Sequence, residues 1–284
     1  MIKHNFRVLP LCTALMAAVP AIPLHADSPA PLPTAGAVLS YADLADLTDS
    51  TPLVIRAQPR KIIPVEPERS RGLRPGWGRF YVEARTEGVI AGTVPLGADL
   101  RYLVDLPLDA KGKPVPFKKK SVVLFARPVP ARPGELQLVR PDAQILWDPA
   151  FDARLRAVIK EFYAADAPQR VTGVREAIHV GGDLAGSGET QLFLATANGE
   201  PAAITVSRQP GAAPRWTVSF SEVVSGDAAT PKRDTLAWYR LACFLPSQLP
   251  AAANISPAAP DRTAAARDYR YVLEQLGPCP RSRK

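Results

Sequence analysis

Residues 190–208 read TQLFLATANGEPAAITVSR, and this stretch decides the fold of the C-terminal half. Two runs of strand-forming residues flank Asn198-Gly199, a pair that tolerates positive φ and marks a tight hairpin. Similar runs lie on either side, VTGVREAIHV at 171–180 and RWTVSFSEV at 215–223. Together these runs predict an antiparallel β-meander.

Helical patterns border this meander on both sides. The run FDARLRAVIKEFYAAD at 151–166 repeats apolar residues at helical spacing and follows Asp148, a natural cap. Two more helices are expected at the C-terminus, one beginning at Asp234 and the other ending at Gly277-Pro278, which is a common helix exit.

The N-terminal half has a different pattern, with short strands separated by Pro, Gly and Lys loops. Five such runs lie between residues 52 and 147, after a short helix that Ser40 would cap. Phe80 and Val82 alternate with more polar neighbours, as in a strand with one buried face. Five strands of this length are typical of a small closed barrel of the OB type, and one layer of a β-sandwich is the alternative.

The fold class is therefore predicted to be α+β, with an N-terminal OB-like small β-barrel followed by a helix, an antiparallel β-meander and two C-terminal helices. The expected division is a signal peptide at 1–26, a disordered leader at 27–39, a β-barrel domain at 40–147 and an α+β domain at 148–284. Composition agrees, since 46% hydrophobic residues exclude a disordered chain and 31 prolines disfavour long helices.

The first 26 residues have the three parts of a secretory signal. Lys3 and Arg7 form a positive start, residues 8–24 are apolar, and the small residue Ala26 precedes the expected cleavage site. A membrane anchor is the alternative, but prolines interrupt the apolar run and no charged stop-transfer segment follows it. We therefore expect a periplasmic or secreted protein with no transmembrane anchor after cleavage.

Cleavage would leave Cys243 and Cys279 as the only thiols and His179 as the only imidazole, and would lower the net charge from +8 to +6 because only Lys3 and Arg7 are lost. Two cysteines in an exported chain predict one disulfide, with two free thiols as the alternative. Two thiolates and one distant histidine do not complete a zinc site, so we expect no metal.

The disulfide sets a condition on the C-terminal helices. If these helices are an antiparallel pair joined by 247–260, Cys243 and Cys279 lie at opposite ends, too far apart to bond. The prediction therefore requires that the proline-rich connector doubles back or that the two helices lie side by side in parallel.

Three stretches, GVREAIHVGGDLAGSGETQLFLAT at 173–196, DTLAWYRLACFLP at 234–246 and YLVDLPLDAKGK at 102–113, resemble an uncharacterised exported protein family of alphaproteobacteria. That resemblance implies export and a shared fold, and it assigns no activity and no functional residue. The N-terminal strands also resemble, more loosely, netrin-like barrels such as tissue metalloprotease inhibitors. Those inhibitors chelate the protease metal with an N-terminal cysteine, which a chain starting near Asp27 lacks.

A basic surface with interspersed aromatic residues is the main candidate binding site. Its predicted members are Arg71, Arg74, Trp77, Arg79, Tyr81, Lys118, Lys119 and Lys120. Cations and aromatics on a barrel face are typical of sites that bind anionic polymers. Outside the cytosol, anionic lipid, lipopolysaccharide or acidic glycan is the expected partner and nucleic acid is not; the alternative is a pair of solvated loops.

The glycine-rich stretch GGDLAGSGET at 181–190 fits neither a phosphate loop nor a nucleophile elbow, so we expect a hairpin loop and no cofactor. A triad of Ser187, His179 and Asp183 can be written within it, although hydrolysis would also need an oxyanion hole. If the neighbours of His179 face the core, its own side chain faces solvent or a groove.

Two further constellations have ordinary structural explanations. Three carboxylates, Glu176, Glu189 and Glu222, could form an acid–base pair, but charged residues are common on an exposed sheet face. Trp238, Tyr239 and Phe244 could form a ligand box, although their helical spacing with neighbouring leucines indicates packing against the meander.

The sequence therefore favours an exported, non-catalytic binding or structural module that contacts an anionic envelope partner through a basic barrel face. The alternative, from a different class, is an envelope hydrolase that uses the loop at 176–191. An enzyme requires a concave site that gathers oriented polar groups, whereas a binding module requires contiguous positive surface.

Overall fold

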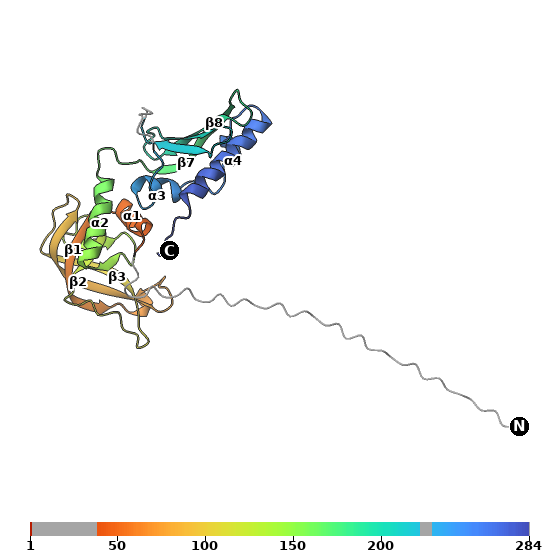
Figure 1. Ribbon diagram of the computed structural model, residues 1–284. Coiled ribbons are helices and arrows are strands. Elements are labelled where there is room, and N and C mark those ends of the chain that lie inside the picture. The colour runs from red at the N-terminus through yellow and green to blue at the C-terminus, as the bar shows by residue number, and fades with distance from the viewer. Residues whose placement is uncertain (2–38, 222–228, 284) are drawn as a thin grey trace.

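The structure is a computed structural model, and it describes Met1, residues 39–221 and residues 229–283. Residues 2–26 of the predicted signal peptide, nearly all of the predicted leader and Glu222 lie outside these described residues. Two β-sheets, each with its own hydrophobic core, form the described part of the chain. In Figure 1 helices α1 (Tyr41–Asp49) and α3 (Leu236–Ala242) lie between them.

Five strands form the N-terminal barrel, and their hydrogen bonding follows the order β1-β2-β3-β5-β4, with β1 pairing back to β4. This closure and the antiparallel β1–β2–β3 meander confirm the predicted OB-like barrel. The strands are β1 (Leu53–Pro64), β2 (Trp77–Ala91), β3 (Asp99–Pro107), β4 (Val122–Pro128), β5 (Glu135–Leu138) and the additional β6 (Gln144–Leu146).

The last predicted barrel strand, at 135–147, is two strands in the structure. β5 pairs in parallel with β3 and antiparallel with β4, while β6 pairs with the first half of β4. Pro141 lies between them, and its carbonyl accepts a hydrogen bond from the Asp105 amide. Because proline has no N–H to continue a ladder, the chain bends there and both segments share one edge of β4.

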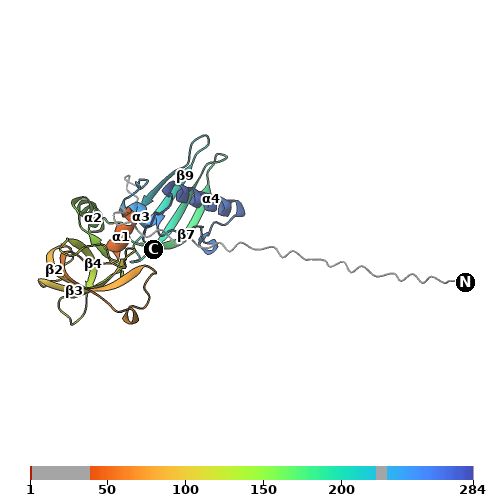
Figure 2. The same ribbon diagram turned by 90° about the horizontal axis from the view of Figure 1, so that it is seen from below.

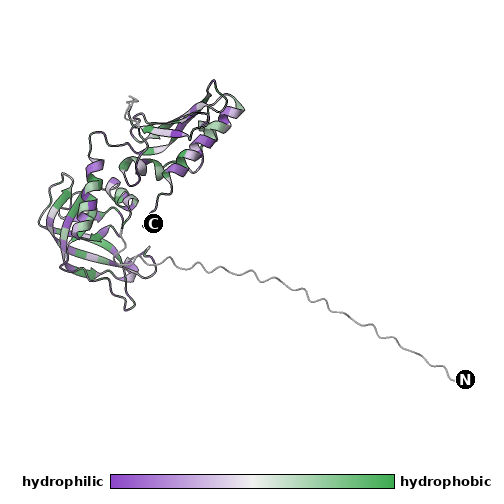
Figure 3. Cartoon of the chain, viewed as in Figure 1, coloured by the Kyte–Doolittle hydropathy of each residue, from purple (hydrophilic) through white to green (hydrophobic). Residues whose placement is uncertain are grey.

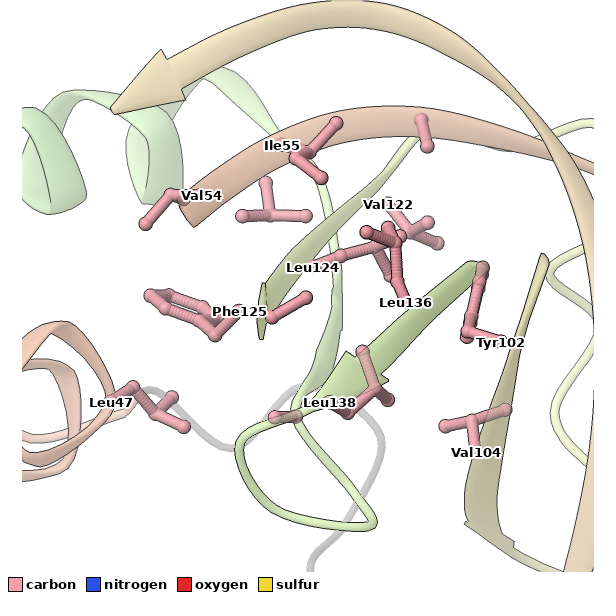
Figure 4. Close-up of a cluster of buried hydrophobic side chains, with 14 of the residues drawn as sticks. Leu47, Val54, Ile55, Tyr102, Val104, Val122, Leu124, Phe125, Leu136 and Leu138 are labelled. Atoms are coloured by element: carbon pink, nitrogen blue, oxygen red, sulfur yellow. The ribbon is translucent and has the colours of Figure 1, made fainter. Parts of the chain in front are cut away.

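Side chains from every part of the barrel meet in one core. Figure 4 shows Leu47 of a preceding helix among residues of β1, β3, β4 and β5. Phe125 and Leu124 of β4 are fully buried, and Tyr102 of β3 is 2% exposed. A core filled from all sides fixes the barrel as a rigid support for its outer face.

Four further strands form the predicted meander, in the order β10-β9-β8-β7. They are β7 (Val171–Gly181), β8 (Gly188–Thr196), β9 (Ala203–Arg208) and β10 (Arg215–Ser219). Gly199 has φ +79° in the β8–β9 connection, as the Asn-Gly signal predicts. Helix α4 (Ala259–Leu276) lies along one face of this sheet in Figure 2.

The other helices begin close to the predicted caps. Ser40 forms a capping box with Asp43 at the start of α1 (Tyr41–Asp49), and Asp148 caps α2 (Pro149–Phe162). α3 (Leu236–Ala242) is capped by Thr235. In Figure 3 hydrophilic and hydrophobic segments alternate along the helices, as expected for helices with one buried face.

Helix α1 belongs to both cores. Leu44 and Leu47 are buried with the barrel residues, while Ala42 and Ala45 are buried with the meander residues. Its small alanines allow close approach on one side, and its leucines fill space on the other. The two units are therefore joined through a shared helix as well as through the chain that links them.

Cys243 and Cys279 form the predicted disulfide, with Sγ atoms 2.04 Å apart and Cα atoms 5.2 Å apart. The connector between α3 and α4 doubles back, as the disulfide requires. It runs along the sheet, where Ile255 donates its amide to the carbonyl of Ala177 in β7. α4 then returns along the sheet, and its end meets α3, where the indole of Trp238 donates to the Leu276 carbonyl at 2.8 Å.

Candidate binding surface

Strand β2 gathers three of the predicted binding residues on one side of the barrel. Trp77, Arg79 and Tyr81 occupy alternate positions of the strand. Between them Phe80 is 6% exposed, and Val82 beyond is fully buried. Because successive strand side chains point to opposite faces, these three predicted members all point outward from the core.

An apolar row crosses this outward face. Tyr81 pairs with Ile63 of β1 on one side and with Leu103 of β3 on the other. Ile63 is 37% exposed and Leu103 is 49% exposed. Sequence reasoning missed these two residues, although their outward positions in the strand alternation are a signal that could have found them. Exposed apolar side chains in a contiguous line are typical of an interaction surface.

The charges beside the apolar row are mostly paired. Arg79 donates to both carboxylate oxygens of Asp105, at 2.7 and 2.9 Å, and these bonds raise the pKa of Arg79 above its usual value. Lys61 lies 3.7 Å from Glu83 on the neighbouring strand pair. Paired charges attract a polyanion less than free cations do, but they present donors and acceptors in fixed positions.

A pocket of about 170 Å³ lies at the start of β2, between the loop at 65–76 and the segment after β5. Its lining residues are Gly72, Arg74, Trp77, Asp105, Arg140, Pro141 and Asp142. Arg74 and Trp77 were predicted members of the basic surface. The others come from parts of the chain that only the barrel topology brings together, and no local sequence signal marks them.

Arg74 is held from two directions in this pocket. Its guanidinium lies over the indole of Trp77, 3.8 Å from the ring centroid, and it donates to Asp142 at 2.8 Å. Arg283 of the C-terminal tail also lies 3.0 Å from the Asp142 carboxylate. Burial alone would raise the pKa of Asp142, but these two arginines hold it below its usual value.

Two further arginines lie at or near this pocket, and three lysines lie farther along the barrel. Arg140 makes no ion pair with any described residue, and Arg71 is exposed in the loop at 65–76. Lys118, Lys119 and Lys120 are exposed before β4, where the Lys119 amide donates to the Pro59 carbonyl. That contact is about 20 Å along β1 from the pocket end, so the lysines form a separate patch.

The Ser187–His179–Asp183 triad that can be written from the sequence is not assembled. The Ser187 hydroxyl donates to the Leu184 carbonyl at 2.7 Å and accepts from the Leu184 amide at 3.2 Å within the hairpin turn. His179 faces the core beneath α4 with 7% exposure, whereas Val180 beside it is 61% exposed. The imidazole therefore lies on the covered face of the sheet, away from that hydroxyl.

His179 instead belongs to a buried polar relay. Its Nδ1 lies 2.8 Å from the Thr190 hydroxyl, which donates to the carboxylate of Asp268 at 2.5 Å. Arg208 also donates to Asp268, which is fully buried in α4. Since the threonine hydrogen is directed at the carboxylate, His179 Nδ1 is the donor to Thr190, and this nitrogen lies 3.7 Å from the Asp268 carboxylate.

The sequence did not indicate Asp268, because it lies 78 positions after Thr190 in a separate helix. A buried carboxylate needs partners, and here Arg208, Arg267 and Thr190 supply them. Within the described residues nothing is hydrogen-bonded to His179 Nε2, so the relay orients the imidazole but brings no nucleophile to it.

The remaining candidates have structural roles or are separated. Glu176 and Glu189 share the outer face of the meander, but Glu189 pairs with Val180, which places their backbone positions about 13 Å apart along the strand. The strand register therefore does not place them side by side as a carboxylate pair. Trp238 and Tyr239 are each 1% exposed and pack in the core, as their helical spacing indicates.

No protein-family model matches the chain, and no curated protein matches it either. Within the described residues, the helices are too short or too polar to cross a membrane. The same residues contain no cluster of three or more His, Cys, Asp or Glu side chains arranged to hold a metal ion.

Proposed function

We propose that this protein is an exported, non-catalytic binding module that contacts an anionic partner of the cell envelope through the outer face of its barrel. The observation that carries the proposal is the apolar row of Ile63, Tyr81 and Leu103, which lies between Arg–Asp and Lys–Glu pairs on a rigid strand face. OB barrels use the face of strands 2 and 3 for oligosaccharides and oligonucleotides, and this comparison is by fold alone.

Cations around this face add long-range attraction. Arg71 precedes Gly72 of the pocket wall, and the lysine patch at 118–120 lies farther along the barrel, beside Pro59 of β1. A polymer or membrane surface is large enough to meet both, whereas a small ligand is not. Because exposed charges are screened by salt, binding through them weakens as ionic strength rises.

The test is retention of the purified protein on vesicles of phosphatidylglycerol, on immobilised lipopolysaccharide and on polygalacturonate, at low and high salt. We expect salt-sensitive retention on at least one of these, and a clear loss when Tyr81→Ala and Leu103→Ser remove the apolar row. Replacement of Lys118–Lys120 by glutamate should weaken retention further. Retention that is absent on all three, or unchanged by both sets of substitutions, contradicts the proposal.

An envelope hydrolase acting near residues 176–191 is the second candidate, and the observation that favours it is the relay of Asp268, Thr190 and His179. With no side-chain nucleophile at Nε2 among the described residues, a water molecule would have to attack the substrate. Loss of hydrolysis of peptidoglycan or glycan substrates in His179→Gln, with unchanged thermal stability, would support it. Equal activity in both proteins removes it.

A further inference from the structure

We propose that the pocket beside Trp77 binds one carboxylated sugar unit of an acidic polysaccharide. The inference rests on the proposed function and narrows its partner from any anionic envelope surface to a uronate-containing glycan. It is carried by the size of the pocket, by the mixture of arginine and aspartate in its walls and by its position at one end of the apolar row.

The size of the pocket suits a single ring. Its volume of about 170 Å³ equals the volume of about six water molecules in the liquid. That is room for one six-membered ring with its substituents, and it is below the range of sites that enclose drug-sized ligands. Trp77 and Pro141 supply apolar wall for the C–H groups of such a ring.

The charges in the walls select the kind of anion. Arg74 and Arg140 would favour a negative group, but Asp105 and Asp142 line the same small space. A phosphate with two charges would meet both carboxylates at short range, where repulsion is strong. A uronate has one carboxylate for an arginine, and its hydroxyls are donors for aspartate oxygens, which only accept.

Arg140 is the residue best placed to hold the carboxylate. Arg79 binds Asp105 and Arg74 binds Asp142, whereas Arg140 has no ion pair among the described residues. Its planar guanidinium can make two parallel hydrogen bonds to a carboxylate. Arg74, which is fixed between Trp77 and Asp142, has less freedom to do so.

The surface beside the pocket continues in a way that suits a polymer. From Trp77 the outward face of β2 passes Arg79 and reaches Tyr81 and Leu103 after four residues, about 13 Å along the strand. A glycan anchored in the pocket by one unit could therefore lay its next units over the Arg79–Asp105 pair and the apolar row. The pocket and the apolar row would then bind successive units of one glycan chain.

The experiment uses the oxidised full chain and calorimetric titration with trigalacturonate, with fully methyl-esterified trigalacturonate as the uncharged ligand. We expect wild type to bind the acid and to bind the ester at least tenfold more weakly. Arg140→Ala should lose at least tenfold in affinity for the acid and change little for the ester. Arg140→Lys keeps the charge without the paired geometry and should lose an intermediate amount.

The matched control is Arg270→Ala, which removes an exposed arginine from α4 in the meander unit and should change trigalacturonate affinity less than twofold. Circular dichroism and thermal melting verify that each variant folds. Equal binding of acid and ester, equal binding by Arg140→Ala and wild type, or displacement of trigalacturonate by equimolar inorganic phosphate each overturns the inference.

The two proposals fail in different ways. If trigalacturonate does not bind, but wild type is still retained on phosphatidylglycerol vesicles or lipopolysaccharide and loses retention with the Tyr81 and Leu103 changes, the pocket inference is wrong and the binding face stands. If the protein is retained on none of these and does not bind trigalacturonate, both proposals are wrong.

Discussion

At Gly188 the chain has no room for a side chain. A Cβ placed there would lie 2.8 Å from Cε1 and 2.9 Å from Nε2 of His179, and 2.9 Å from the carbonyl of Val180. We predict that Gly188→Ala lowers the free energy of unfolding by about 1–3 kcal/mol, because a buried ring and a backbone carbonyl must both move. Urea denaturation measures this.

Gly181 provides a matched control, since it pairs directly with Gly188 across the same hairpin and a Cβ there would have nothing within 4 Å. Gly181→Ala should change the stability by less than about 0.5 kcal/mol, as is usual for surface positions. Equal losses in the two variants would show that the contact with His179 is not the cause.

A second residue-scale prediction concerns Asp43, which is 1% exposed. Burial alone would raise its pKa, but hydrogen bonds from Ser282, Ser40 and Arg283 hold the pKa below its usual value. The folded state thus favours the charged carboxylate. Its contribution to stability is complete above the unfolded pKa, about 3.9, and is lost as the pH falls through the lower folded value.

Asp43→Asn should therefore be less stable than wild type near neutral pH, and this difference should shrink as the pH is lowered below about 4. Urea denaturation of both proteins at a series of pH values checks the prediction. A difference that is constant across the series would mean that the charge of Asp43 does not contribute, and that only its shape in the α1 cap matters.

At the scale of elements, the disulfide joins the end of α3 to the residues just after α4 across 36 positions. Closing a loop of that length in the unfolded chain is worth about 3–4 kcal/mol on the chain-entropy model. We predict that the Cys243→Ala, Cys279→Ala double variant loses stability of this order in urea denaturation. Wild type treated with a reductant should lose a similar amount, and an unchanged transition would contradict the prediction.

The elements show which parts of this fold could be predicted from sequence. Local signals were reliable: Ser40 and Asp148 cap their helices, and Gly199 forms the meander hairpin. These depend on backbone preferences of a few adjacent residues. The split of residues 135–147 was missed, because Pro141 bends a strand-like run whose pairing depends on the distant β3 and β4.

The candidate site was predictable to a similar degree. Trp77, Arg79 and Tyr81 share a face because a strand alternates, and the sequence alone shows that. Arg140 joins the pocket only because parallel pairing of β5 with β3 brings the segment after β5 beside the start of β2. Asp268 meets Thr190 only because α4 returns along the sheet. Contacts of this kind follow from topology, which local patterns do not contain.

At the scale of the whole molecule, the C-terminal tail holds the two units together. After Cys279 it lies against α1, where Arg281 binds Asp46 through two hydrogen bonds of 2.6 and 3.2 Å. Ser282 donates to Asp43 through its amide and its hydroxyl. Arg283 then reaches Asp142 in the barrel. The disulfide joins the start of this tail to the end of α3. The tail therefore holds α1 against the meander unit.

Removal of residues 280–284 should therefore loosen α1 without unfolding either core. Asp43 and Asp46 would lose their partners from the tail, and a buried carboxylate left with fewer hydrogen bonds is destabilising by a few kcal/mol. We predict faster amide hydrogen exchange across residues 41–49, with little change in β4 or β8. Arg281→Gln should show a smaller effect of the same kind. If exchange in α1 is as slow in the truncated protein as in wild type, the shared core alone joins the two units and the tail contributes nothing to their union.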